Sequence, residues 1–178
     1  MSAYKKLIPI PESGMQLADK PILFVLVGLP GSGKSTWAQQ TFGWQVYDEH
    51  VVSMDYFVDL YAQQKGKTYD QVWLKASKDA EKKMNERAAQ LIKDKKLIIW
   101  DQTNLSAKKR KAILSRIPKA YKKYVVVFNI EESVRQVRVK KRADDIGKSI
   151  PEDVIASMKK SFEFPDIEKE KFDDIAVI

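Results

Sequence analysis

The stretch Gly28-Leu29-Pro30-Gly31-Ser32-Gly33-Lys34-Ser35 decides the fold of this chain. It fits the pattern G-x-x-x-x-G-K-[ST], with the apolar run 22–27 before it and Thr36-Trp37-Ala38 after it. A strand before this phosphate-binding loop and a helix after it are the context that the pattern requires. A glycine-rich turn without a ligand is the alternative, and the agreement of strand, motif and helix argues against it.

The loop predicts a site for a nucleoside triphosphate, expected to be ATP, together with Mg²⁺. Glycine residues let successive backbone N–H groups turn toward phosphate oxygens, and the start of the next helix adds its positive dipole end. Lys34 would reach the β- and γ-phosphates, while the Ser35 hydroxyl would ligate Mg²⁺. The loop residues expected to bind the nucleotide are Gly28, Gly31, Ser32, Gly33, Lys34, Ser35 and Thr36.

Length and composition predict one domain in a reducing environment. With 178 residues, 44% of them hydrophobic, the chain can bury one core, which we assign to residues 21–178 after an N-terminal extension, 1–20. The absence of cysteine excludes disulfide partners and thiolate chemistry. No apolar run approaches the roughly 20 residues that span a bilayer, and the N-terminus lacks a signal-peptide pattern. We therefore expect a soluble intracellular protein without a membrane partner.

The charge balance favours polyanionic partners. Lys and Arg number 32 against 24 Asp and Glu, which gives a net charge of +8 and a pI near 9.4. DNA or RNA is one expected partner of such a surface. The alternatives are a basic surface that only keeps the protein in solution, and charge that serves the nucleotide phosphates.

Apolar runs that read as strands alternate along the chain with segments that read as helices. Apolar residues at 72, 76, 80, 84, 88 and 91 predict an amphipathic helix over 70–93. Strands are expected at 22–27, 50–54, 97–100, 124–130 and 175–178. Helices are expected from Lys34 into 42–47, over 107–117, after Ser133 as its cap, and from Pro151. This alternation predicts an α/β fold with a five-stranded parallel sheet covered on both faces.

Two aspartates are predicted to join the phosphate-binding loop, because ligands bind beyond the carboxyl ends of parallel strands. Asp101 follows the run 97–100 and is expected to hold the Mg²⁺ shell opposite Ser35. Its alternative role is to cap the next helix, for which Asn104 or Ser106 is better placed. Asp55 follows the run 50–54 and is a candidate base that deprotonates an acceptor hydroxyl. An N-cap for the segment from Tyr56 is the alternative.

Three arginines are expected on one face of the helix after Ser133. Arg135, Arg138 and Arg142 are spaced by three and four residues. Guanidinium groups bind phosphate through two parallel hydrogen bonds and offset its charge. The polar segment 143–149 after them would allow the arginines to move as a lid over the nucleotide. A solvated basic face is the alternative.

These blocks together resemble bacteriophage-type polynucleotide 5′-hydroxyl kinases. The resemblance rests on 28–37 (GLPGSGKSTW), 53–56 (SMDY), 101–105 (DQTNL), 138–142 (RVKKR) and 150–154 (IPEDV). The blocks 101–106 and 147–164 are also similar to the kinase-like domain of heterogeneous nuclear ribonucleoprotein U. Both resemblances cover roughly residues 21–178.

The resemblance implies an adenylate-kinase-like P-loop fold with three layers and an arginine-bearing lid. It implies transfer of the ATP γ-phosphate to the 5′-hydroxyl of DNA or RNA. Asp55 falls on the family's general base and Asp101 on its second essential carboxylate. Arg138 and Arg142 fall on the lid arginines, of which Arg142 would contact the donor phosphates.

One departure concerns the acceptor. The phage kinases carry an arginine three residues after the base, where this chain has Val58. Three hypotheses therefore stand: a polynucleotide 5′-kinase, a kinase of a hydroxymethylated pyrimidine or a small-molecule alcohol, and a non-catalytic ATP- and nucleic-acid-binding module. The ribonucleoprotein domain lacks an aspartate at the base position, so Asp55 argues for catalysis.

Overall fold

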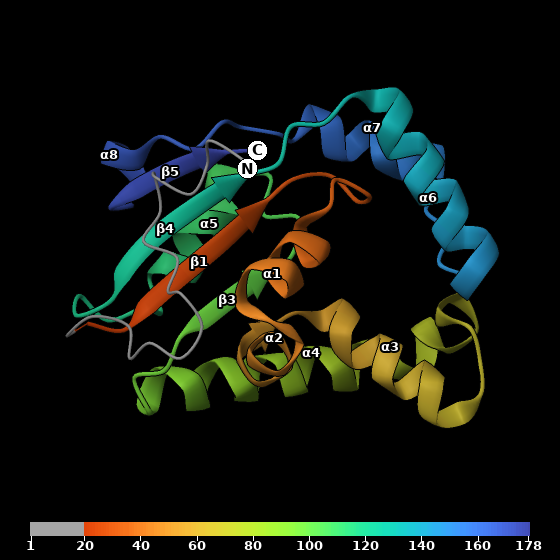
Figure 1. Ribbon diagram of the computed structural model, residues 1–178, viewed down its shortest axis with the longest axis horizontal. Helices are drawn as coiled ribbons and strands as arrows, with labels where there is room; N and C mark the ends of the chain where they lie inside the picture. Colours follow the sequence, from red (N-terminus) through yellow and green to blue (C-terminus); the bar gives the residue numbers. More distant parts are fainter. Residues whose placement is uncertain (1–19) are drawn as a thin grey trace.

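A five-stranded parallel sheet forms the centre of the protein. The computed structural model describes residues 20–178, so nearly all of the predicted extension 1–20 lies outside the described residues. The strands lie in the order β2-β3-β1-β4-β5 (Figure 1). This confirms the predicted adenylate-kinase-like P-loop fold. The strands are β1 (Ile22–Val27), β2 (Val51–Val52), β3 (Ile98–Asp101), β4 (Lys122–Val127) and β5 (Asp174–Val177).

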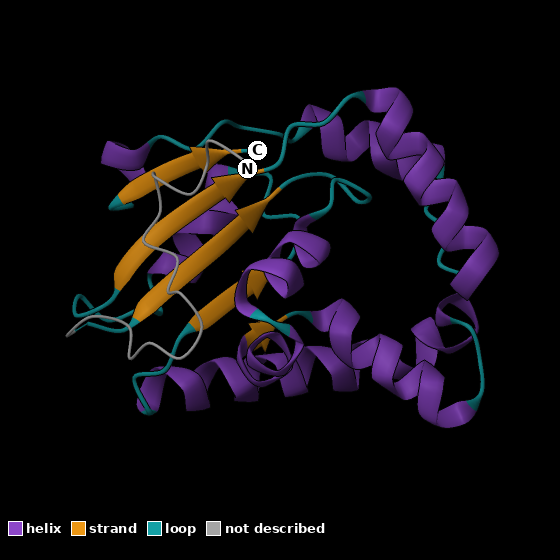
Figure 2. Cartoon of the chain, in the orientation of Figure 1, coloured by secondary structure: helices purple, strands orange, loops and turns teal. Residues whose placement is uncertain are grey.

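Helices follow each strand but the last, and Figure 2 shows them on both sides of the sheet. The helices are α1 (Lys34–Phe42), α2 (Trp44–His50), α3 (Met54–Lys65), α4 (Tyr69–Lys93), α5 (Ala107–Leu114), α6 (Glu132–Ile146), α7 (Glu152–Lys160) and α8 (Ile167–Glu170).

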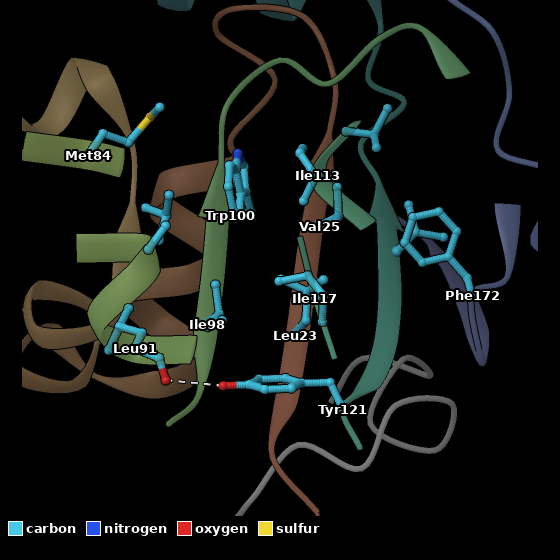
Figure 3. Close-up of a cluster of buried hydrophobic side chains, with 14 of the residues drawn as sticks. Leu23, Val25, Met84, Leu91, Ile98, Trp100, Ile113, Ile117, Tyr121 and Phe172 are labelled. Atoms are coloured by element: carbon cyan, nitrogen blue, oxygen red, sulfur yellow. Dashed lines mark hydrogen bonds between the residues drawn. The ribbon is translucent and has the colours of Figure 1, made fainter. Parts of the chain in front are cut away.

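Alternate side chains of β1 separate the two faces of the sheet. Leu23 and Val25 point into a core that α4 and α5 cover, and Figure 3 shows Leu91 and Ile113 in the same cluster. The Tyr121 hydroxyl closes this core by donating to the Leu91 carbonyl at 3.1 Å. Because a strand turns successive side chains to opposite faces, Ile22, Phe24 and Leu26 face the second layer of helices.

The opposite face is covered by α1 and α2 and is rich in aromatic residues. Phe24 packs against Phe42, with ring centroids 5.2 Å apart, and against Tyr124 at 5.4 Å. Trp37 contacts the same ring edge-on at 6.4 Å. This packing fixes α1, and with it the phosphate-binding loop, against the sheet.

Several predicted boundaries were wrong. The helix expected from Lys34 into 42–47 is two helices, because Gly43 has φ 85° and ψ 153° and breaks the backbone. The strand expected at 50–54 is reduced to two residues, and helix α3 begins at Met54. The helix expected over 107–117 ends at Leu114. Ser133 is not a cap, since α6 begins at Glu132 without a side-chain cap.

The predicted amphipathic helix over 70–93 is confirmed as α4, which begins one residue earlier. A capping box formed by Thr68 and Gln71 fixes that start. The first half of α4 packs on α3 through a separate apolar cluster, which includes Val58 and Val72. Helices α3, α6 and α7 lie beyond the arrowheads of the strands (Figure 1). Among residues 20–178, no helix is both long enough and apolar enough to cross a membrane.

Candidate active site

A large cavity lies where the carboxyl ends of the strands meet the projecting helices. Its volume is 1590 Å³. The phosphate-binding loop, α1, α3, α4, α6, α7 and the loop after β3 all contribute to its walls. Predicted site residues that line it are Gly31, Ser32, Gly33, Lys34, Ser35, Thr36, Asp55, Asp101, Arg138 and Arg142. Gly28, at the end of β1, is the predicted site residue that does not line it.

The phosphate-binding loop has the backbone that its glycines predict. Gly33 precedes α1 with φ 96°, a conformation that residues with a Cβ rarely adopt. A Cβ at this position would also lie 3.1 Å from Nη1 of Arg138. The loop is therefore shaped to bring the backbone N–H groups and the α6 arginine close together.

Lys34 is buried at the centre of the loop. Its ammonium donates to the carbonyls of Gly28 at 2.9 Å and Leu29 at 3.0 Å. Burial lowers the pKa of Lys34 to about 8, while Asp101 and Asp55 act in the opposite direction. Both predicted carboxylates are thus close enough to act on this lysine. The structure brings together the three segments that the sheet-edge rule predicts.

Ser35 and Asp101 both lie near the hydroxyl of Tyr47. That hydroxyl donates to Oδ2 of Asp101 at 2.8 Å. Burial and Asp101 raise the pKa of Tyr47, while its hydrogen bond with Ser35 acts in the opposite direction. A hydroxyl oxygen and a carboxylate oxygen beside one another are the ligands that Mg²⁺ accepts together with phosphate and water. The residues present therefore fit the predicted Mg²⁺ site.

The loop after β3 is held in place by Asn104. This buried residue has φ 47°, and its amide donates to the Leu26 carbonyl at 2.8 Å. The Gly28 amide in turn donates to the Thr103 carbonyl at 3.0 Å. These bonds fix the loop after Asp101 to the start of the phosphate-binding loop. Ser106 caps α5, so Asp101 does not serve as that cap.

Asp55 lies in the first turn of α3 and faces the cavity. Ser53 is the N-cap of this helix, since its hydroxyl accepts from the amide of Tyr56 at 3.4 Å. The alternative role of Asp55 as an N-cap was therefore wrong. Its carboxylate accepts from the hydroxyl of Tyr69 at 2.7 Å and contacts the Lys148 ammonium at 2.9 Å.

The charges around Asp55 keep it ionised. Burial alone would raise its pKa, but the Lys148 ammonium and the Tyr69 hydroxyl lower it below the ordinary value. The Asp55 side chain is nonetheless 51% exposed, because it opens onto the cavity. For Asp59, one turn later, burial and the charge of Asp55 raise the pKa. Asp55 is thus an ionised carboxylate that a ligand in the cavity can reach.

Helix α6 carries the predicted arginines, but they do not share one role. Arg138 and Arg142 line the cavity. Arg135 is buried, pairs with Glu132 at 2.6 Å, and donates to the Pro30 carbonyl at 3.3 Å. It therefore holds α6 against the phosphate-binding loop. The segment expected as a polar loop over 143–149 is helical up to Ile146, so the predicted loop began too early.

Sequence reasoning missed Tyr47, Tyr69 and Lys148. Each touches a predicted aspartate from another element of the fold. Tyr47 and Tyr69 belong to no motif, and Lys148 was noted only within the segments 143–149 and 147–164; no spacing pattern connects any of them with its partner. Only the packing of α2, α4 and the α6–α7 connection brings these side chains to the site.

The family model of the AAA domain, AAA_33, matches residues 23–165. The chain belongs to this family. Its sheet order and its glycine-rich loop are those of a P-loop fold. The specific assignment to phage polynucleotide kinases goes further than this family does.

Solved structures share the fold at low sequence identity. A candidate kinase from Chloroflexus aurantiacus is 15% identical with a TM-score of 0.58, over 89% of this chain and 85% of its own. A fungal RNA kinase is 12% identical with a TM-score of 0.53, over 89% and 73%. The PezAT toxin-antitoxin structure from Streptococcus pneumoniae is 14% identical with a TM-score of 0.53, over 93% and 69%. At these identities the likeness concerns the fold alone.

Proposed function

We propose that this AAA_33 member transfers the γ-phosphate of ATP to the 5′-hydroxyl of DNA or RNA. The observation that carries the proposal is the position of Asp55. Its ionised, half-exposed carboxylate opens onto the same cavity as Lys34 and the phosphate-binding loop. A non-catalytic binding module would not need a carboxylate of this kind opposite the phosphates.

In the proposed reaction Asp55 accepts the proton of the acceptor hydroxyl. The hydroxyl oxygen bonds to the γ-phosphorus, the bond from that phosphorus to the β–γ bridging oxygen breaks, and ADP leaves. Lys34 would exchange its loop carbonyls for phosphate oxygens. Arg138 and Arg142 would bind the same phosphates from α6 and offset the charge of the transferring group.

Mg²⁺ would be held by Ser35 and Asp101. When bound, it would neutralise charge on the β- and γ-phosphates. The Tyr47 hydroxyl keeps the Asp101 carboxylate in place, because it donates to Oδ2. Asn104 keeps the Asp101 loop against β1.

Three observations support a nucleic-acid acceptor: the net charge of the chain, the volume of the cavity and the fold shared with an RNA kinase. The chain carries a net charge of +8, and Lys109 and Lys141 line the cavity beyond the residues assigned to ATP. The cavity volume of 1590 Å³ exceeds the 300–1,000 Å³ typical of a single small-molecule site. A fungal RNA kinase shares the fold. Val58 is fully buried, so the acceptor must be bound by other residues.

The decisive experiment is transfer from [γ-³²P]ATP to a panel of acceptors. The panel holds 5′-hydroxyl DNA and RNA oligonucleotides, DNA with 5-hydroxymethyl pyrimidines, and small alcohols. The proposal expects label at the oligonucleotide 5′ end with the native protein and none with K34A. Label only on the hydroxymethylated base or on a small alcohol would contradict the 5′-hydroxyl acceptor and identify the labelled compound as the acceptor instead. Absence of label from every acceptor would favour the binding module.

A further inference from the structure

The connection between α6 and α7 is docked on the corner between α3 and α4. Gly147 ends α6 with φ 59°, and a Cβ there would lie 2.6 Å from Cβ of Thr68. The Asp70 amide donates to the Gly147 carbonyl at 3.0 Å. The Ser149 amide donates back to the Asp70 carboxylate at 3.1 Å. Contacts on both sides of position 148 therefore fix its backbone.

This docking inserts the Lys148 side chain between three partners. Only 4% of the side chain is exposed. Its ammonium lies 2.9 Å from Asp55 and 3.5 Å from Asp59, and 3.9 Å from the centre of the Tyr69 ring. A buried ammonium is costly unless it is paired, and here two carboxylates and an aromatic face share its charge. Such a lysine is placed to act on those carboxylates.

From this geometry we infer that Lys148 is a positioning residue for phosphoryl transfer. Its ammonium orients the Asp55 carboxylate toward the cavity and keeps it from sharing a proton with Asp59. The inference rests on the proposed function, in which Asp55 is the base. Lys148 does not contact the transferring phosphate in this assignment; it acts through Asp55.

The position of Asp59 supports this role. It lies one helical turn after Asp55, so the two carboxylates face the same side of α3. Like charges at this spacing disfavour ionisation of both groups, and one of them would take up a proton without a cation nearby. The charged groups that face Asp55 are Lys148 from the α6–α7 connection, Asp59 from α3, Tyr69 from α4, Arg142 from α6 and Lys34 from α1.

The test measures the titration of Asp55 directly, without ATP or an acceptor. Selective ¹³C labelling of aspartate carboxyls gives the signal, and its loss in D55N assigns it. In K148M the midpoint of Asp55 should rise by about one unit or more, because the ammonium is gone while burial and Asp59 remain. K141M removes one positive charge from another cavity wall and should leave that midpoint almost unchanged.

A second variant predicts a shift of opposite sign. In D59N the repulsion from the neighbouring carboxylate is lost and the ammonium pairs with Asp55 alone, so the midpoint should fall. D59N tests the inference even if K148M does not fold. An unchanged midpoint in either folded variant overturns the inference, and so does a shift in K141M as large as that in K148M.

Kinetics then separates this inference from the proposed function. With an active acceptor, the acid limb of kcat/KM should move up in K148M together with the NMR midpoint. If no acceptor is phosphorylated, the proposed function fails while the NMR titration still decides the role of Lys148. If the NMR midpoint of Asp55 moves but the acid limb of kcat/KM does not, Asp55 is not the base, and the positioning role of Lys148 is contradicted.

Discussion

Asp55 is the residue on which the proposed chemistry depends. Asn in its place keeps the shape but cannot accept the hydroxyl proton, so D55N should abolish most phosphoryl transfer. ATP affinity should stay within a few-fold, because the phosphate-binding loop and the Ser35–Asp101 pair are untouched. Ser53 caps α3, so no cap is lost. Transfer assays together with calorimetric titration of ATP would check both expectations.

Retained transfer in D55N would contradict the assignment. The base would then have to be Asp48 or Glu49, of which Asp48 lines the cavity. Absence of transfer in the native protein would instead favour the non-catalytic module. D59N also replaces a carboxylate of α3 near Lys148 but should keep transfer near neutral pH, because the fall that we expect in the Asp55 midpoint leaves Asp55 ionised.

Lys34 tests the donor side of the site. K34A should lower ATP turnover by on the order of a hundredfold or more, because phosphoryl transfer depends on electrostatic positioning. The melting temperature of K34A should change little, since the variant also removes the free-energy cost of burying an ammonium. Turnover and thermal unfolding measured on one preparation would check this. A folded variant with near-native turnover would overturn the site assignment.

Replacing the two cavity arginines of helix α6 should lower turnover without lowering the stability of the protein. R138A and R142A remove cations from the cavity wall, so each should lower turnover by about tenfold or more. The melting temperature should hardly change, because Arg135 keeps α6 on the loop through Pro30. K140A, an exposed position outside the cavity, is the matched control on the same helix. Unchanged turnover in both arginine variants would leave only a solvated basic face.

Helices α5 and α8 are joined by a buried ion pair. Arg110 donates to both oxygens of Glu170 at 2.7 and 2.8 Å, and to the carbonyls of Asn104 and Leu105. R110M leaves the Glu170 carboxylate buried without a cationic partner, so the free energy of unfolding should fall by about 3–5 kcal/mol. Urea unfolding would measure the loss.

Two further variants test the cause of that loss. R110M/E170M should recover part of it, because no charge is then left unpaired. K82A breaks an exposed pair with Glu86 and should cost less than about 1 kcal/mol. An R110M protein as stable as the native one would show that the pair does not hold the loop after β3.

The net charge of +8 on the whole molecule supports the proposed binding of nucleic acid through phosphate contacts. Binding of a labelled 5′-hydroxyl oligonucleotide should weaken steeply as salt rises, because each neutralised phosphate releases condensed counterions. For a single strand, the slope of log K against log salt is about −0.7 per phosphate contacted. Fluorescence anisotropy between 50 and 200 mM salt (roughly the range where the effect is largest) would measure it. A flat salt dependence would contradict a polynucleotide acceptor.

The sequence predicted the sheet and the donor side of the site better than the acceptor side. The glycine motif and the apolar runs reveal the phosphate-binding loop, and parallel strands bring Asp101 to the same edge. Helix α3 was missed because the run 50–54 was interpreted as one strand, whereas β2 has only two residues and the helix already begins at Met54. Lys148 and Tyr69 reach Asp55 only through packing between helices, which no local pattern encodes.

Helix α4 has a consequence for how this protein can evolve. Its 25 residues extend for about 37 Å. The first half, up to Ala80, belongs to the cluster shared with α3, and the second half, from Met84, belongs to the core beneath the sheet. Under the proposed function, substitutions in the first half would reshape the cavity wall that α3 and α4 form without disturbing the core beneath the sheet. Selection could then change the acceptor while the phosphate donor stays the same.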